Sequence, residues 1–146
     1  MINGKLISKI LGSLLFIEGG LLLICLLLSL FYKENDWSSF AITIGLTVVL
    51  GVIFKFIGKN AEYRMGQKEG YFIVTISWIA FSFIGMLPYY IGNFIPSVTD
   101  AFFETMSGFT TTGASILNNI ESLPHGILFW RSMTQWIGGL GIVFFT

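Results

Sequence analysis

Long apolar stretches alternate with short polar connections along the chain. Four of them are long enough to cross a membrane as helices: residues 6–32, 37–57 and 71–91, and a fourth that begins at about residue 125. A helix needs about 20 predominantly apolar residues to cross the hydrocarbon core, and it satisfies its own backbone groups there. The pattern therefore predicts an all-α integral membrane protein.

The first apolar stretch has some features of a signal peptide, because Lys5 and Lys9 precede its core. It is too long for a signal peptide, however, and no small-residue cleavage site follows it. We therefore expect a retained helix that forms a hairpin with the second stretch through the polar link 33–36.

A segment with a different pattern lies between the third and fourth stretches. Residues 100–109 are typical of a short helix, and the cap-forming residues Ser97, Thr99 and Asp100 stand at its beginning. Such a helix rises only about 16 Å, roughly half the hydrocarbon thickness of a bilayer. β-Branched residues and a glycine follow and favour extended backbone: Thr110, Thr111, Thr112 and Gly113.

A half-helix followed by extended backbone, between two spanning helices, predicts a re-entrant pore loop. In a cation filter, backbone carbonyls replace part of the water around the ion, and the half-helix directs its negative C-terminal end toward it. Gly113 would supply a backbone conformation that a side chain hinders. The alternative is a surface turn that joins two helices.

Composition agrees with the membrane class and excludes others. Of the 146 residues, 54% are hydrophobic and 11% are charged, and the mean hydropathy is +0.80. The formal net charge is zero, so nothing suggests binding to nucleic acid. The sequence has one cysteine, Cys25, and one histidine, His125. It has no group of residues with the spacing of metal ligands and no catalytic triad. We therefore expect a packing role for Cys25 and no enzyme activity.

The distribution of basic residues predicts the orientation. Two precede the first stretch, one lies in the link to the second, four lie between the second and third, and none lies between the third and fourth. The positive-inside rule then places the N-terminus and the 55–70 loop, where Gly66 and Gly70 should break any helix, in the cytoplasm. The protein is expected in the cytoplasmic (inner) membrane as a multi-pass protein, with its pore loop entering from outside.

Two charged residues inside apolar stretches need an explanation. Glu18 either serves another helix or a gate as a partner, or is protonated or interfacial. Arg131 either braces the pore loop by bonding carbonyls or a carboxylate such as Glu104, or extends to the outer surface. Gly138, Gly139 and Gly141 allow close helix contact or a flexible point.

Residues 100–115 and 129–142 together resemble the Trk-type potassium uptake proteins, the TrkH/KtrB branch of the potassium transporter superfamily. The similarity is strongest over residues 97–142, and the preceding hairpin resembles the extra N-terminal pair of TrkH-like members. The resemblance implies four membrane–pore–membrane repeats around one pore, with a potassium filter built from one loop of each. Thr111, Thr112 and Gly113 then occupy the filter positions, next to Thr110.

The resemblance also implies how the chain is divided and what it contacts. Residues 1–69 would be a transmembrane hairpin with a cytoplasmic loop, and residues 70–146 a first repeat that stops inside its second helix. The chain would thus be an N-terminal fragment. Its expected partners are membrane lipid, the other repeats, a second copy in a homodimeric parent and a cytosolic nucleotide-binding regulatory subunit.

Two functions of different class remain open from the sequence. The first is potassium uptake through the filter, with potassium as the bound ion. The second is a non-conducting membrane scaffold or assembly subunit whose loop serves packing alone. Conduction by four associated copies is a variant of the first.

Overall fold

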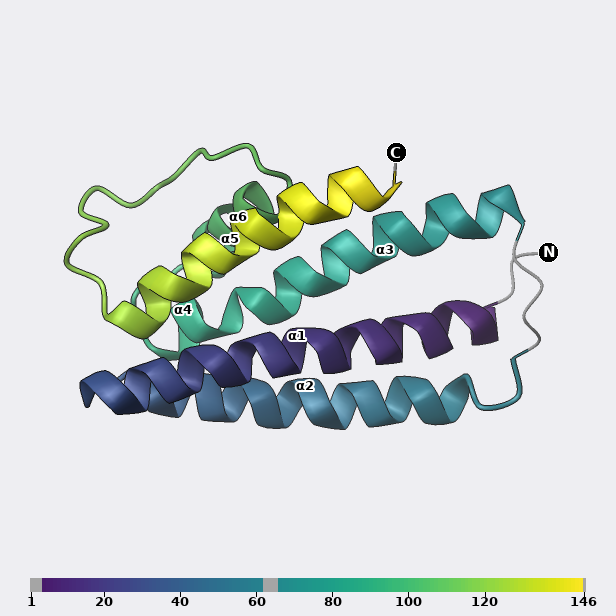
Figure 1. Ribbon diagram of the computed structural model, residues 1–146, viewed down its shortest axis with the longest axis horizontal. Helices are drawn as coiled ribbons and strands as arrows, with labels where there is room; N and C mark the ends of the chain where they lie inside the picture. The colour runs from purple at the N-terminus through teal and green to yellow at the C-terminus, as the bar shows by residue number, and fades with distance from the viewer. Residues whose placement is uncertain (1–3, 62–65, 146) are drawn as a thin grey trace.

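The computed structural model describes residues 4–61 and 66–145, and all regular structure in these two ranges is helical (Figure 1). The helices are α1 (Gly4–Tyr32), α2 (Trp37–Ile57), α3 (Gln67–Gly85), α4 (Leu87–Ile91), α5 (Val98–Phe109) and α6 (His125–Phe145). Three segments are long and apolar enough to cross a membrane: Gly4–Tyr32, Trp37–Ile57 and Gly70–Ile91. The predicted all-α membrane class is confirmed.

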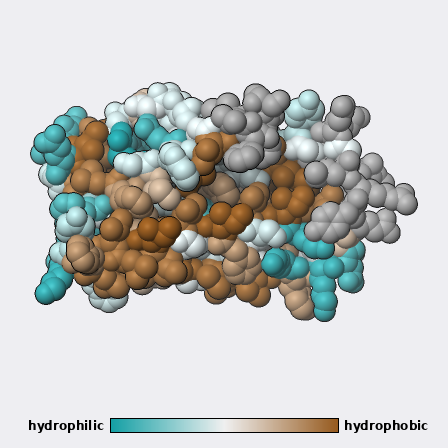
Figure 2. Space-filling view, viewed as in Figure 1, coloured by the Kyte–Doolittle hydropathy of each residue, from teal (hydrophilic) through white to brown (hydrophobic). Residues whose placement is uncertain are grey.

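The first two helices form the predicted hairpin and lie side by side along their length (Figure 1). Residues on the buried face of α1 recur every three or four positions, as helical geometry requires: Leu11, Leu15, Glu18, Leu22 and Cys25. Large apolar side chains are exposed on the outer faces, including Leu27, Val49 and Ile53. Figure 2 shows this apolar surface along the lower part of the molecule, with hydrophilic residues at its left and lower right ends and on its upper left side.

Glu18 lies in the middle of α1 and is buried against the neighbouring helices, with 2% of its surface exposed. Neither carboxylate oxygen has a hydrogen-bond partner within the described ranges. The structure therefore places this carboxyl inside the helix bundle and not at an interface.

The third predicted stretch is divided into α3 and α4 at Met86. Pro88 has no N–H to donate to the preceding turn, which explains the break. At the other end, the prediction that Gly70 breaks any helix is wrong, because α3 begins at Gln67 and the Gly70 N–H donates to the carbonyl of Gly66 at 3.1 Å. A glycine costs a helix only about 1 kcal/mol, too little to end a long apolar one.

The short helix α5 follows, with twelve residues against the ten predicted. The hydroxyl of Ser97 caps it by accepting the N–H of Asp100 at 3.4 Å. Residues 110–124 then form a long arc on the outside of the helices that ends at α6 (Figure 1).

The main hydrophobic core includes residues of all six helices, and large aromatic side chains pack in it where α3, α5 and α6 meet. Trp130 of α6 and Phe109 of α5 are buried there in edge-to-face contact, with ring centroids 6.3 Å apart. The indole N–H of Trp130 donates to the carbonyl of Gly85 at 2.8 Å, which ties α6 to the end of α3.

The fourth predicted stretch is helical, but α6 is not among the three helices long and apolar enough to span a membrane. Polar residues such as Arg131 and Gln135, together with several glycines, lower its apolar character. That it crosses the membrane therefore stays a prediction.

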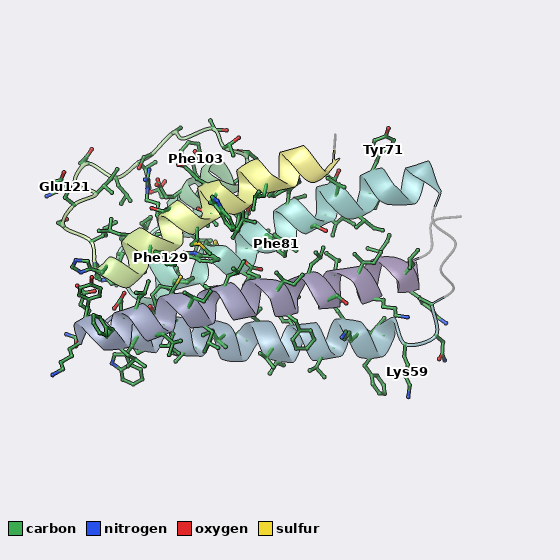
Figure 3. All side chains as sticks on the ribbon, in the orientation of Figure 1. Lys59, Tyr71, Phe81, Phe103, Glu121 and Phe129 are labelled. Carbon is green, nitrogen blue, oxygen red and sulfur yellow. The ribbon has the colours of Figure 1, made fainter. Side chains whose placement is uncertain are left out.

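Lys59 and Glu121 lie at opposite ends of the molecule, so the 55–61 segment and the 110–124 arc are well separated (Figure 3).

Candidate functional site

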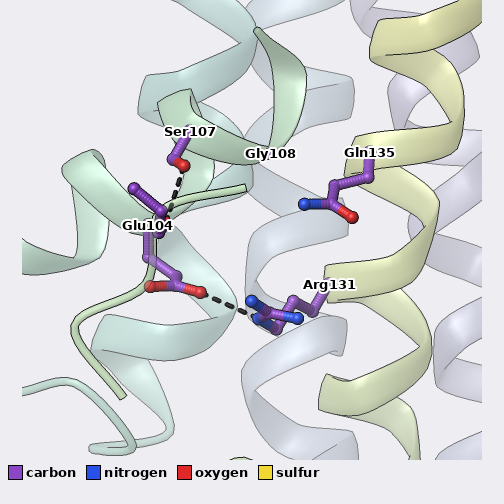
Figure 4. A pocket seen from close by; sticks show the side chains of 6 residues that line it. Glu104, Ser107, Gly108, Arg131 and Gln135 are labelled. Carbon is purple, nitrogen blue, oxygen red and sulfur yellow. Dashed lines mark hydrogen bonds and ion pairs between the residues drawn. The ribbon is translucent and has the colours of Figure 1, made fainter. Parts of the chain in front are cut away.

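The carboxylate of Glu104 lies at the centre of the candidate site. It projects from α5, and only 2% of its side chain is exposed. Arg131 of α6 donates from Nε to its Oε1 at 2.8 Å, and 22% of the arginine side chain is exposed (Figure 4). The sequence left two positions open for the Arg131 side chain, beside the pore loop or at the outer surface. In the structure the side chain is paired with Glu104.

The same carboxylate also binds the loop that follows α5. The hydroxyl of Ser115 lies 3.0 Å from both Oε1 and Oε2, and the N–H of Ile116 donates to Oε2 at 3.1 Å. Donors from a guanidinium, a hydroxyl and a backbone amide compensate the loss of water around the buried charge. Glu104 thereby joins α5, α6 and the loop.

A second set of bonds holds the loop against the last turn of α5. The Ser107 hydroxyl donates to the carbonyl of Ala114 at 2.6 Å, drawn in Figure 4. The carbonyl of Ser107 accepts from the N–H of Thr112 at 3.0 Å. The segment from Thr112 to Ala114 is therefore fixed from the side that faces α5.

The four residues predicted as the filter, 110–113, begin as a turn and not as extended backbone. Thr110 and Thr111 donate their N–H groups to the carbonyls of Met106 and Gly108, so they first complete the helix end. Thr111 (φ 55°) and Gly113 (φ 74°) both have left-handed backbone. The extended backbone that was predicted directly after α5 is therefore absent at Thr110 and Thr111.

The turn is exposed on the side away from the helices. All residues from Thr110 to Ile116 are exposed, whereas Glu104, Ser107 and Gly108 beneath them are buried. The hydroxyl oxygens of Thr110 and Thr112 lie 2.9 Å apart. The turn therefore has a bound inner side and a free outer side.

Helix α6 supports the turn from behind at two positions. A Cβ added to Gly138 would clash with the carbonyl oxygen of Phe109 and lie 2.8 Å from its carbonyl carbon. A Cβ added to Gly113 would lie 3.5 Å from the amide nitrogen of Gln135. The glycine at 138 thus permits α6 to touch the backbone at the end of α5.

Sequence reasoning assigned no role to Ser107, Ser115 or Gln135. The two serines lie inside the segment that carries the resemblance, but nothing in their spacing indicates bonds to Ala114 and Glu104. Their roles depend on how the loop returns along α5, which only the three-dimensional path shows.

This arrangement can present oxygen atoms to a cation without using a carboxylate. Within residues 4–61 and 66–145, no cluster of His, Cys, Asp and Glu could hold a metal ion. Glu104 is saturated by internal donors. The groups left at the exposed turn are backbone carbonyls and threonine hydroxyls, which suit a weakly held cation that exchanges with water.

Comparison with known proteins identifies the family. A family model described as "TrkH: Cation transport protein" matches residues 37–146, which is most of the chain. The chain belongs to the TrkH family of cation transport proteins. This family is one of transporters and not of enzymes.

Similar proteins extend the match to the N-terminal hairpin. The chain is 36% identical over 141 residues to the Trk system potassium uptake protein TrkH of Escherichia coli (strain K12), which covers 95% of the chain and 29% of that protein. It is 40% identical over 139 residues to the uncharacterized cation transporter MJ1485 of Methanocaldococcus jannaschii, covering 94% and 28%.

A solved structure has the same fold. The crystal structure of the potassium transporter TrkH from Vibrio parahaemolyticus matches with a TM-score of 0.89 at 34% identity, over 98% of this chain and 31% of that one. The chain thus spans less than a third of the length of the TrkH relatives that it matches.

Proposed function

We propose that this chain forms the first pore repeat of a potassium uptake protein and supplies one side of its selectivity filter. Potassium would be held by backbone carbonyls of Thr111, Thr112 and Gly113, with Thr110 at the edge of the site. The relatives named as potassium uptake proteins support potassium as the transported ion.

One observation carries the proposal. A twelve-residue helix, too short to cross a bilayer, ends in an exposed turn with two left-handed residues, and Glu104, paired with Arg131, binds the residues that follow this turn. An exposed, rigid turn at the negative end of a half-helix suits an ion that must give up water and regain it.

The remaining parts of the proposal concern the whole protein. Residues 1–69 form the N-terminal hairpin and cytoplasmic loop, and residues 70–146 form the repeat, with α6 crossing the inner membrane beside the loop. The N-terminus is cytoplasmic. The other repeats complete the filter, and a second copy of the parent and a cytosolic nucleotide-binding subunit are its further partners.

The test is Gly113→Ser in a full-length pore protein that carries this chain. At φ 74° a side chain costs about 1 kcal/mol or more, so the turn should reshape and direct a carbonyl away from the ion. We expect a lower preference for potassium over sodium at unchanged membrane abundance. The assay is competitive rubidium and sodium uptake in cells without other potassium importers.

Gly45→Ser is the matched control, because a Cβ at this position in α2 meets no atom within 4 Å. It should keep the wild-type ion preference. If Gly113→Ser also keeps it while inserting normally, Gly113 is an ordinary turn glycine, and the scaffold function gains support instead.

A further inference from the structure

The beginning of α6 is held by the turn of the N-terminal hairpin. Glu34, in the link between α1 and α2, accepts the backbone N–H of His125 on Oε2 at 2.7 Å, and its Oε1 lies 2.8 Å from Nδ1 of the same residue. The first N–H groups of a helix lack partners within it, and a carboxylate there also meets the positive end of the helix dipole. Glu34 therefore caps α6 from a distant part of the sequence.

Tyr32, the last residue of α1, and Asp36, in the link, add to this contact between the hairpin and the beginning of α6, which we call the seat of α6. The ring of Tyr32 stacks on the imidazole of His125, with centroids 4.1 Å apart and planes 7° from parallel. Asp36 is buried, and one of its oxygens accepts from the Ser29 hydroxyl. Its other oxygen lies against Gly126 and has no hydrogen-bond partner in the described part of the chain.

The fit at Gly126 leaves no room for a side chain. An added Cβ would clash with the second Asp36 oxygen and lie 3.0 Å from the ring of Phe40. The first turn of α6 is therefore seated directly on the hairpin, with contacts from both α1 and α2.

Helix α6 connects this seat to the loop. Arg131 lies six residues after His125, about 9 Å along the helix axis, and its guanidinium holds Glu104. A helix of this length moves as a stiff rod, and Trp130 anchors it next to Arg131, so a displaced first turn should tilt the helix about that anchor and turn the guanidinium relative to Glu104. Trp130 and Gly138 hold α6 independently, so the helix should tilt slightly and not detach.

We propose that Glu34 is a positioning residue for the ion pathway: by capping α6 it sets the place of Arg131, and through Glu104 the conformation of residues 110–116. This inference rests on the proposed function, since it assigns regulation of ion preference to a residue outside the filter. The hairpin then supports the filter mechanically and is more than a membrane anchor.

Two variants of Glu34 in the full-length protein, reconstituted in lipid nanodiscs, test the cap itself. Glu34→Ala removes both acceptors, and the amides in the first turn of α6 should exchange hydrogen about fivefold faster, the effect expected for a lost helix cap. Glu34→Gln keeps the shape and an oxygen acceptor, so its exchange should stay near the wild-type rate. Unchanged exchange in Glu34→Ala would overturn the proposal.

Ion preference tests the connection to the filter. In competitive rubidium and sodium uptake at matched abundance, Glu34→Ala should lower the preference for rubidium, and Glu34→Gln should restore most of it. Glu121→Ala, which removes an exposed carboxylate at the same end of the molecule, should change neither exchange nor preference. A purely structural contact would lower abundance and leave preference unchanged, and that result would also overturn the proposal.

The Gly113→Ser variant distinguishes a failure of the proposed filter from a failure of the positioning role of Glu34. If Gly113→Ser changes ion preference and Glu34→Ala does not, the filter is correct and the positioning role is wrong. If neither variant changes it, the proposed function fails and the positioning role fails with it, whatever the exchange data show about the cap.

Discussion

At the scale of single residues, Glu104 and Arg131 depend on each other unequally. The carboxylate is 2% exposed, whereas the guanidinium is 22% exposed and can turn toward water. Loss of the arginine would leave a buried charge with only neutral donors from Ser115 and Ile116. Loss of one partner of a fully buried pair costs about 3–5 kcal/mol, and the partial exposure of Arg131 reduces that figure here.

This asymmetry predicts a non-additive pair of substitutions. Arg131→Met alone should destabilise the protein by about 2 kcal/mol, because it strands the Glu104 charge. Adding Glu104→Gln should recover part of the loss, since a neutral amide can still bond Ser115 and Ile116. Denaturant unfolding in micelles measures all four members of the cycle.

Lys59→Met serves as the control for loss of a cation, because Lys59 is exposed two residues beyond the end of α2. It should change stability by less than 0.5 kcal/mol, the usual range for an exposed residue. Simple additivity of Arg131→Met and Glu104→Gln would mean that the ion pair contributes nothing to stability.

The sequence indicated the need for a partner at Arg131 but not which one. The pair is 27 residues apart, and its formation depends on how α5 and α6 rotate about their axes. Gly113 invited a left-handed backbone, and the structure has one there. The residue type at Thr111 gave no such indication, because β-branched residues rarely adopt positive φ. There the left-handed backbone accompanies two bonds at the helix end, from the Thr111 N–H to Gly108 and from the Thr112 N–H to Ser107.

At the scale of the elements, the contact between α5 and α6 is the one on which the candidate site depends. The bounds of α2 and the length of α5 could be predicted, because hydropathy and capping residues determine them locally. The division of the third stretch was missed although Pro88 gives a physical reason for it. The close approach of α6 to the end of α5 could not be predicted, since three nearby glycines were equally suitable.

The approach predicts different effects for adjacent glycines of α6. Gly138→Ala should place a methyl group against the carbonyl of Phe109, push the helices apart and destabilise the protein by about 1–3 kcal/mol. In Gly139→Ala the new methyl meets only a methyl group of Thr111, at 4.0 Å, and a helical alanine is favourable. Thermal unfolding of both variants measures the difference, and equal effects would contradict the close contact.

At the scale of the whole molecule, the arrangement separates basic and acidic connections. The segment with Lys59 lies at one end, and the hairpin turn and the arc with Glu121 lie at the other (Figure 3). Hydropathy predicted the number and approximate limits of the apolar stretches, but α6 is less apolar than the sequence pattern suggested. The membrane class is secure from composition alone, whereas the seat of α6 on the hairpin joins residues 91 positions apart and left no trace in the sequence.

Single cysteines test the orientation. Asn35→Cys and Asn119→Cys should react with an impermeant thiol reagent added to intact cells, and Asn60→Cys should react only after the membrane is opened. All three positions are exposed, and native Cys25 is buried, so background labelling should be low. Labelling of Asn60→Cys from outside would reverse the proposed orientation.

The ion pair between Glu104 and Arg131 also constrains how the protein is made. The ribosome synthesises Glu104 27 residues before Arg131. An unpaired charge in the bilayer costs about 2.5–3.5 kcal/mol. Because α6 is itself only weakly apolar, neither segment is well suited to leave the translocation machinery alone. We therefore expect the hairpin to enter the membrane first, and α5 and α6 to follow together with the charges of Glu104 and Arg131 already paired.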